Sequence, residues 1–196
     1  MKCPSCGVPF STPPAACPKC KLTLAQLDQK FGLVPYCSRY LSDRAERLTG
    51  QEIEDLRAVL RLFERKFPQI VFAVLVINLG EQISMSEYAF WLGNRARFSS
   101  VGAVGPKNFD LLLIVDPQGR AAAMVAGYGL EKYLGEQDLQ DTLDAASGFP
   151  AGELARGIRE SIEFLTTRLR DIALRIEEAA FAAKTATAVA AKASAS

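Results

Sequence analysis

The first twenty residues contain four cysteines in two matched pairs. Cys3 and Cys6 form one Cys-x-x-Cys pair, Cys17 and Cys20 form the other, and a proline follows the first cysteine of each. Each such turn holds two thiolates on one side of a tight loop, so two turns supply the four corners of a tetrahedron. Soft thiolates in this arrangement select Zn²⁺ over Mg²⁺ or Ca²⁺. Because four protein ligands close the coordination shell, we expect a structural zinc site.

Two disulfides or a redox pair are the alternative interpretation of these cysteines. No βαβ pattern surrounds either pair, and the start of the chain lacks the apolar segment of a secretory signal, so we favour zinc. A fifth cysteine, Cys37, has no histidine to activate it, because the chain contains none. We interpret Cys37 as a packed apolar residue rather than a nucleophile.

Composition limits the classes of partner. The 196 residues are 49% hydrophobic and carry a formal net charge of +1, which fits one domain with a small appendage. The longest apolar run, residues 70–77, is far shorter than the roughly 20 residues of a membrane span. A zinc ion held by four thiolates carries about −2 and offsets the lysines around it. We therefore expect a cytoplasmic protein with an unidentified protein partner, no nucleic acid and no membrane span, its oligomeric state left open.

The spacing of apolar residues predicts an α/β protein. Thr49 and Glu52 form a capping box that opens a helix, and Ser84 and Glu87 have the same spacing. Strands are predicted at 70–77, 111–115 and 121–126 and helices at 22–31, 49–67, 84–96, 136–146 and 150–176. A strand, a helix and a second strand in this order favour a right-handed parallel unit, followed by an antiparallel hairpin strand. The expected fold is an α/β/α sandwich with a mixed, mostly parallel sheet, plus a small zinc ribbon at the N-terminus.

Four regions follow from this pattern. Residues 1–21 form the ribbon, residues 22–34 a linker with a short helix, and residues 35–178 the α/β domain with its long C-terminal helix. Residues 179–196 are rich in alanine and lack large apolar anchors apart from Phe181. We expect this last segment to be a frayed helix or a disordered tail.

Several segments together resemble the TPM-domain family, which includes plant thylakoid-lumen proteins related to photosystem repair and many bacterial relatives. The resemblance covers residues 35–165, and its most specific mark is the sequence from Gly127 to Glu131, Gly-Tyr-Gly-Leu-Glu. Ser84–Ala89 and Asp110–Val115 also fit, Asp43 matches an early aspartate and Gly157 a late glycine. In place of the family's usual Asp-Asn-Gly before the second strand, this chain has Asn108-Phe109-Asp110.

The resemblance implies the sandwich fold and two functions. Some plant members are acid phosphatases, some members bind divalent metal, and others act as accessory factors of membrane complexes. For this chain we expect an accessory or protein-interaction role. The alternative is a phosphatase that acts on small phosphate esters with Mg²⁺ or Ca²⁺.

The candidate catalytic residues for that alternative are Asp43, Asp116 and Glu131. Two of them also have a structural interpretation: Asp116 begins a predicted turn with Pro117, and the glycines beside Glu131 allow positive φ. A candidate pocket adds polar and glycine residues near the strand ends, namely Asn78, Glu81, Asp110, Gly127, Tyr128 and Gly129. Arg95, Arg97 and Lys107 could hold a phosphate or simply offset a helix dipole.

Overall fold

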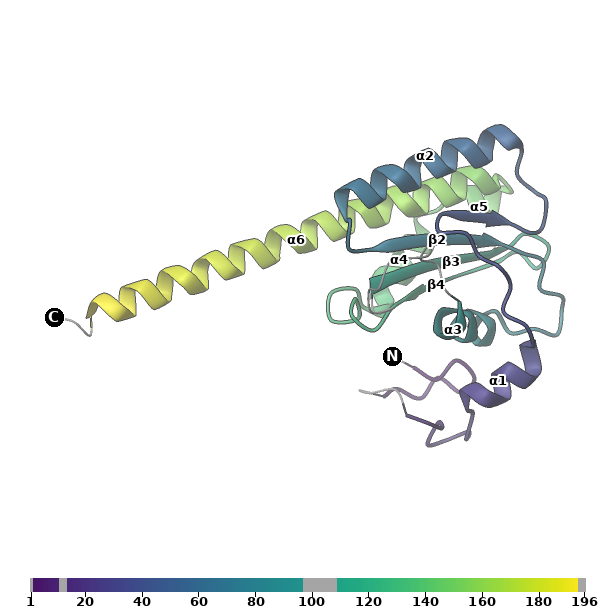
Figure 1. The fold of residues 1–196 in the computed structure, drawn as a ribbon, viewed down its shortest axis with the longest axis horizontal. Coiled ribbons are helices and arrows are strands. Elements are labelled where there is room, and N and C mark those ends of the chain that lie inside the picture. The colour runs from purple at the N-terminus through teal and green to yellow at the C-terminus, as the bar shows by residue number, and fades with distance from the viewer. Residues whose placement is uncertain (1, 11–13, 97–108, 194–196) are drawn as a thin grey trace.

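A four-stranded mixed sheet forms the centre of the molecule (Figure 1). The computed structural model describes residues 2–10, 14–96 and 109–193, with backbone alone for 184–193. The strands lie side by side in chain order: β1 (Leu41–Asp43), β2 (Val71–Val76), β3 (Asp110–Asp116) and β4 (Ala121–Ala126). β1, β2 and β3 are parallel and β4 is antiparallel to β3, which confirms the predicted mixed sheet.

Three helices cover one face of the sheet. α2 (Gly50–Lys66) and the first half of α6 (Leu154–Ala193) run side by side over it, and α4 (Glu136–Asp144) packs against β4 and α6. Buried residues of the strands meet Leu60 and Phe63 of α2 and Ile158, Ile162 and Leu165 of α6 in one core. This burial fixes the direction in which α6 leaves the domain.

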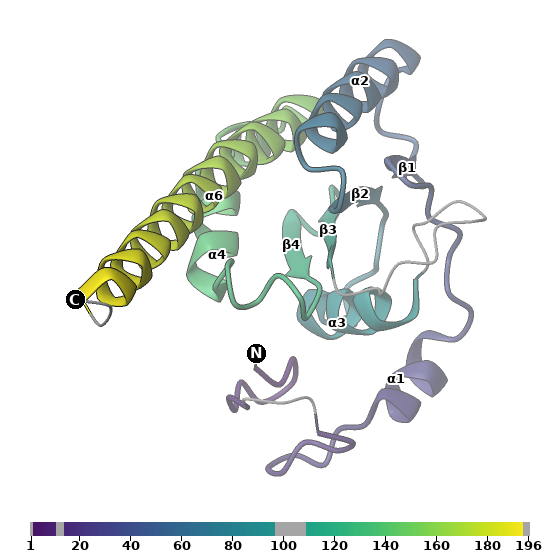
Figure 2. The ribbon, with the colours of Figure 1, turned by 60° about the vertical axis from the view of Figure 1, so that its left-hand side comes forward.

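The opposite face is covered by α3 (Met85–Arg95), and α1 (Leu24–Phe31) lies outside α3 (Figure 2). The second core lies between the sheet and these helices and includes Leu27, Trp91 and Leu92. The layers are therefore helix, sheet, helix, as predicted, with α1 as an additional layer that links the N-terminal segment to the domain.

Helix starts follow the predicted caps only in part. Thr49 and Glu52 make both hydrogen bonds of a capping box. Ser84 accepts the backbone N–H of Glu87, but the Glu87 carboxylate binds Lys30 of α1 at 2.7 Å instead of returning to the cap. A tertiary ion pair therefore replaces half of the second box.

The C-terminal helix differs from the expectation at both ends. Pro150 lies in the separate short helix α5 (Gly148–Ala151), and Gly152, with φ 78°, divides α5 from α6. At the other end, the helix that we expected to end at residue 176 continues to Ala193, through the segment for which we expected a frayed helix or a disordered tail. Alanine has the highest helix propensity, and no glycine or proline interrupts residues 158–193. None of the helices within the described residues combines the length and apolarity that a membrane crossing needs.

Candidate metal centre

The two cysteine pairs fold into matching turns. In the first turn the N–H of Gly7 donates to the carbonyl of Cys3 at 2.9 Å, and in the second the N–H of Lys21 donates to that of Cys17 at 3.0 Å. In each turn the N–H of the first cysteine also donates, at 2.9 Å, to the carbonyl of the residue after the turn. Gly7 and Lys21 have φ of 70° and 63°, so the second turn places a lysine in the left-handed conformation that favours glycine.

The four sulfur atoms have the spacing of a tetrahedral metal site. The Sγ atoms of Cys3 and Cys20 are 3.5 Å apart, those of Cys6 and Cys17 are 3.6 Å apart, and all four lie within 4.8 Å of one another. A disulfide requires about 2.05 Å, whereas metal–sulfur bonds of about 2.3 Å place sulfurs roughly 3.8 Å apart. The cluster can therefore hold one metal ion with four protein ligands, and the predicted convergence of these cysteines is confirmed.

The local backbone favours thiolate at one of the four sulfurs. Burial raises the pKa of the Cys17 thiol, but the backbone N–H groups of Cys20 and Lys19 and neighbouring thiols outweigh burial and lower the pKa to about 6. Backbone N–H donors stabilise the charged form of a sulfur in the same way that they stabilise a carboxylate. The backbone of this turn therefore favours the charged form of Cys17, which is the form that binds a metal ion.

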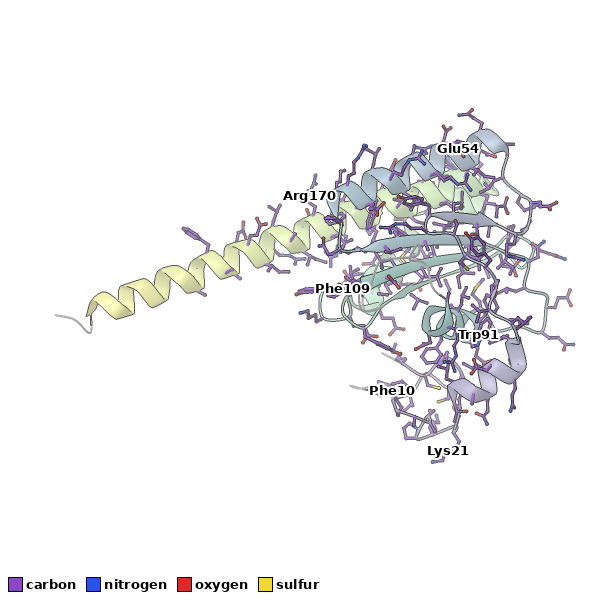
Figure 3. The ribbon with its side chains drawn as sticks, in the orientation of Figure 1. Phe10, Lys21, Glu54, Trp91, Phe109 and Arg170 are labelled. Carbon is purple, nitrogen blue, oxygen red and sulfur yellow. The ribbon has the colours of Figure 1, made fainter. Side chains whose placement is uncertain are left out.

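The ribbon, of which the structure describes residues 2–10 and 14–21, sits against the α/β domain. Lys2 forms an ion pair with Glu136 at the start of α4, at 2.8 Å. A cavity of about 220 Å³ lies between ribbon and domain, and its lining includes Cys3 and Phe10 on one side and Phe90 and Tyr128 on the other. Figure 3 shows Phe10 on the side of the ribbon that faces α3, while Lys21 lies at its outer end.

α1 holds the ribbon in this position. The Asp28 carboxylate accepts hydrogen bonds from the indole N–H of Trp91 at 2.9 Å and from Nε of Arg95 at 2.8 Å. Leu27 is 1% exposed, and the ring of Phe31 lies 5.2–5.3 Å from those of Tyr88 and Trp91. The helix that follows the metal centre, α1, is thus held against α3 by a buried apolar contact and by the ion pairs Asp28–Arg95 and Lys30–Glu87.

The two candidate aspartates lie at the carboxyl edge of the parallel strands. Asp43 at the end of β1 pairs with Val76 of β2, and Val76 pairs with Val115 of β3. Asp43 and Asp116 therefore lie at the same end of the sheet, on the two strands that flank β2. The Asp43 carboxylate accepts the N–H groups of Ala45, Arg47 and Leu48 at 2.8–3.1 Å. Its hydrogen bonds therefore fix the chain between β1 and α2.

The Asp116 carboxylate is similarly engaged with backbone. It is 5% exposed and accepts the N–H groups of Gln118, Gly119 and Leu79 at 2.9–3.3 Å. A Cβ atom on Gly119 would lie 2.6 Å from Asp116 Oδ2, so a larger residue there would displace the carboxylate from its present position. The nearby pocket candidates Asn78 and Glu81 are exposed.

Glu131 and the Gly-Tyr-Gly turn lie at the other edge of the sheet. The N–H of Gly127 donates to the Asp110 carbonyl at 2.7 Å, which places the turn beside the start of β3. β3 is seven residues long and its length, roughly 20 Å, separates this turn from Asp116. The structure therefore brings Asp110, Gly127, Tyr128 and Gly129 together, and it does not bring Glu131 near Asp43 and Asp116.

Tyr128 links this turn to α3. Its hydroxyl donates to Asn94 Oδ1 at 3.0 Å, and the Asn94 amide donates to the carbonyl of Phe90 at 2.8 Å. Burial raises the pKa of Tyr128, and the Glu131 carboxylate adds to this while Asn94 opposes it. The turn therefore contacts the same end of α3 that faces the ribbon.

Comparison with known proteins identifies the domain. Residues 41–168 match the family model of the TPM domain. The chain is a TPM-domain protein. No curated protein matches it significantly.

Three NMR structures share the TPM-domain fold. The N-terminal domain of a P. gingivalis protein is 23% identical, with a TM-score of 0.55 over 67% of this chain and 82% of that one. The BA42 protein of Bizionia argentinensis is 16% identical, with a TM-score of 0.54 and coverages of 66% and 86%. The N-terminal domain of the cg2496 protein of Corynebacterium glutamicum is 12% identical, with a TM-score of 0.51 and coverages of 69% and 82%. At these identities the likeness concerns the fold alone.

Sequence reasoning missed the residues that join the ribbon to the TPM domain. Arg95 was considered as an anion ligand, yet it pairs with Asp28, which is distant in sequence and gave no local signal. Trp91 contributes its N–H to the same carboxylate. Arg97 and Lys107, the other two anion candidates, and Asn108 lie outside the described residues.

Proposed function

We propose that this TPM-domain protein is an accessory factor that binds another protein, and that its ribbon is a structural zinc module. The observation that supports the proposal most directly is that the cysteines converge on one point, while the candidate catalytic carboxylates bind backbone N–H groups. Within the described ranges, the four cysteines are the one group whose ligand atoms converge on a metal-sized site. The carboxylates of Asp43 and Asp116 instead accept three backbone N–H groups each.

Zinc is the metal that best suits the cysteine cluster. Four thiolates in tetrahedral positions are typical of structural Zn²⁺ sites, whereas Mg²⁺ and Ca²⁺ prefer oxygen ligands. A closed shell of four sulfurs leaves no coordination position for a substrate or an activated water. The expected role of the ion is therefore to fold the ribbon and hold its surface in a fixed shape.

The surface formed by the ribbon and α3 is our candidate for the partner contact. The ribbon is held by Leu27 and Asp28 of α1 on one side and by the Lys2–Glu136 pair on the other. Tyr128 of the Gly-Tyr-Gly turn, 42% exposed, faces the same region and lines the cavity shared with the ribbon. A composite surface of this kind lets the family motif and the metal module contact one partner together.

A metal-dependent phosphatase is the second candidate. It is favoured by the position of Asp43 and Asp116 at one carboxyl edge, since ligands of open α/β sheets bind at such edges. For a hard cation to bind there, these carboxylates would have to release some of their backbone hydrogen bonds. The accessory role leaves the carboxylate oxygens of Asp43 and Asp116 bonded to backbone N–H groups, whereas the phosphatase role requires them to bind a metal ion.

One purified sample distinguishes the candidates. Bound metals are measured by elemental analysis, and hydrolysis of a generic phosphate ester is assayed in Mg²⁺, Mn²⁺ or Ca²⁺. The accessory role predicts one zinc per chain, lost in the Cys17→Ser, Cys20→Ser variant, and no hydrolysis above a metal-only blank. Hydrolysis that Asp43→Asn or Asp116→Asn abolishes, while Glu54→Gln on the exposed face of α2 retains it, would instead establish the phosphatase.

A further inference from the structure

The outer edge of β4 carries backbone hydrogen-bonding groups that no described residue uses. The N–H of Gly127 donates to the Asp110 carbonyl, and this bond fixes which residues of β4 are bonded to β3. Because the bonding direction alternates along a strand, the odd-numbered residues of β4 bond to β3 and the even-numbered residues face outward. Within the described residues, the outward N–H and C=O groups of Ala122, Met124 and Ala126 therefore have no partner. The side chains of Ala122 and Ala126 are also partly exposed.

The two edges of the sheet differ in how they are protected. β1 is three residues long, and its outward Leu41 carbonyl accepts the Ser38 hydroxyl at 2.7 Å. β4 is six residues long, contains only alanine, methionine and valine, and pairs with β3 without a bulge. Soluble proteins usually protect an open edge with charges, prolines, bulges or a very short strand, because an unpaired edge is a template for another strand. The edge of β4 has none of these protections.

The cavity of about 220 Å³ between ribbon and domain lies beside this edge, on the α3 side. A Cβ atom on Gly93 of α3 would lie 3.1 Å from Val125 Cγ1, so this part of α3 packs directly on β4. Phe90 and Asn94, on the same flank of α3, and Tyr128, which follows β4, form the domain wall of the cavity. In Figures 1 and 2, β4 is the strand nearest to the ribbon. A closed apolar cavity of about 150 Å³ can bind benzene, so this one can hold a large apolar side chain.

We propose that β4 binds an extended peptide segment of a partner protein as a fifth strand, and that the cavity holds one aromatic or large aliphatic side chain of that segment. In strand addition, main-chain hydrogen bonds provide affinity and a pocket for an alternate side chain provides specificity. Ala123 and Val125 face α3, so the side chains opposite them on the added strand face the cavity. The proposal rests on the accessory role and states which kind of partner that role involves.

A second copy of this chain fits the edge less well than a peptide does. Two β4 strands paired about a two-fold axis would bring both α3 helices and both ribbons to the same side of the joined sheet. The ribbon of each copy is held beside this edge by the Lys2–Glu136 pair, so the two ribbons would compete for one space. The α3-facing residues of β4 are also only alanine and valine, which are too small to fill the cavity. A single peptide strand brings neither problem.

The probe for the test is a displayed library of random linear dodecapeptides, selected on the full chain. We expect the selected peptides to share one aromatic or large aliphatic residue and to bind with micromolar Kd in fluorescence anisotropy. A strand faces its neighbour with every second residue. N-methylation of one alternate set of peptide residues should therefore weaken binding about tenfold or more, because it removes donors to β4. N-methylation of the other set is the matched control and should leave the Kd nearly unchanged.

Amide hydrogen exchange followed by NMR locates the peptide on the protein. Peptide binding should slow exchange at Ala122, Met124 and Ala126, while the odd-numbered residues of β4, already bonded to β3, should change little. Ala122→Pro removes one outward N–H without removing a bond to β3, so it should weaken binding about tenfold. Ala122→Ser keeps the N–H and should bind as the wild type does. Thermal melting shows whether both variants stay folded, and the N-methylated peptides test the same bonds in the unchanged protein.

Three results would overturn strand addition: a library that yields no peptide with micromolar affinity, N-methyl effects that do not alternate, or unchanged exchange at the even-numbered residues of β4. A peptide that binds Ala122→Pro as tightly as the wild type, but not the Cys17→Ser, Cys20→Ser variant, would also refute it. That outcome would leave the ribbon as the partner contact and the accessory role intact. Hydrolysis in the phosphatase assay would instead refute the accessory role, so the two failures are distinguishable.

Discussion

Removal of the metal should unfold the ribbon and leave the TPM domain folded. In the described part of the ribbon only Cys3 and Cys17 are buried, so apolar packing contributes little to its fold. Binding of a structural zinc contributes about 10–16 kcal/mol in small zinc modules, which is far more than a surface of this size can supply. The ribbon should therefore be ordered with metal and unfolded without it.

The effect on the domain is limited by what the ribbon contributes to it. The direct ion pair, Lys2–Glu136, has side chains that are 53% and 66% exposed, and such pairs contribute about 0–1 kcal/mol. For a protein of this size, 1 kcal/mol corresponds to a shift in melting temperature of about 2–4 °C. We thus expect chelation to lower the domain's Tm by no more than that.

Limited trypsin digestion combined with thermal melting provides the assay. Lys19 and Lys21 lie in the second cysteine turn, so cleavage after them should become fast in the metal-free protein and in Cys17→Ser. Cys37→Ser is the matched control, because Cys37 is buried in the α3-side core, away from the cluster. A metal-free ribbon that resists trypsin, or a domain that loses more than about 10 °C in Tm, would refute this reasoning.

Three further predictions concern the described contacts, each measured by urea unfolding with Trp91 fluorescence. Leu27→Ala should cost about 2–5 kcal/mol, since Leu27 is 1% exposed, whereas Gln29→Ala on the outer side of α1 should cost little. Hydrogen bonds from Arg95 hold the pKa of Asp28 below its usual value. The ionised Asp28 therefore stabilises the folded protein fully above about pH 4, and this stabilisation is lost as the pH falls further. The difference in unfolding free energy between the wild type and Asp28→Asn should shrink over the same pH range. Asp116→Ala removes the acceptor of three N–H groups and should cost about 1–3 kcal/mol.

The parts of the fold that depend on local sequence could be predicted. The continuous apolar runs at 71–76 and 111–115 indicated strands covered on both faces, and both are buried in the sheet. The Thr49–Glu52 box fixed the start of α2 because both partners lie within one turn. The half-formed box at Ser84 could not be foreseen, since Glu87 binds a lysine of α1 that is 57 residues away in sequence.

The candidate sites also divide into those that local sequence predicts and those that depend on contacts between distant residues. The cysteine cluster needed only two local turns, so spacing alone was enough to predict it. The carboxylates depended on strand register, which places Asp43 and Asp116 at one edge and the Glu131 turn at the other. Their catalytic role stays a prediction. Family resemblance marked Tyr128, but its contact with Asn94 and its position facing the ribbon required the tertiary structure.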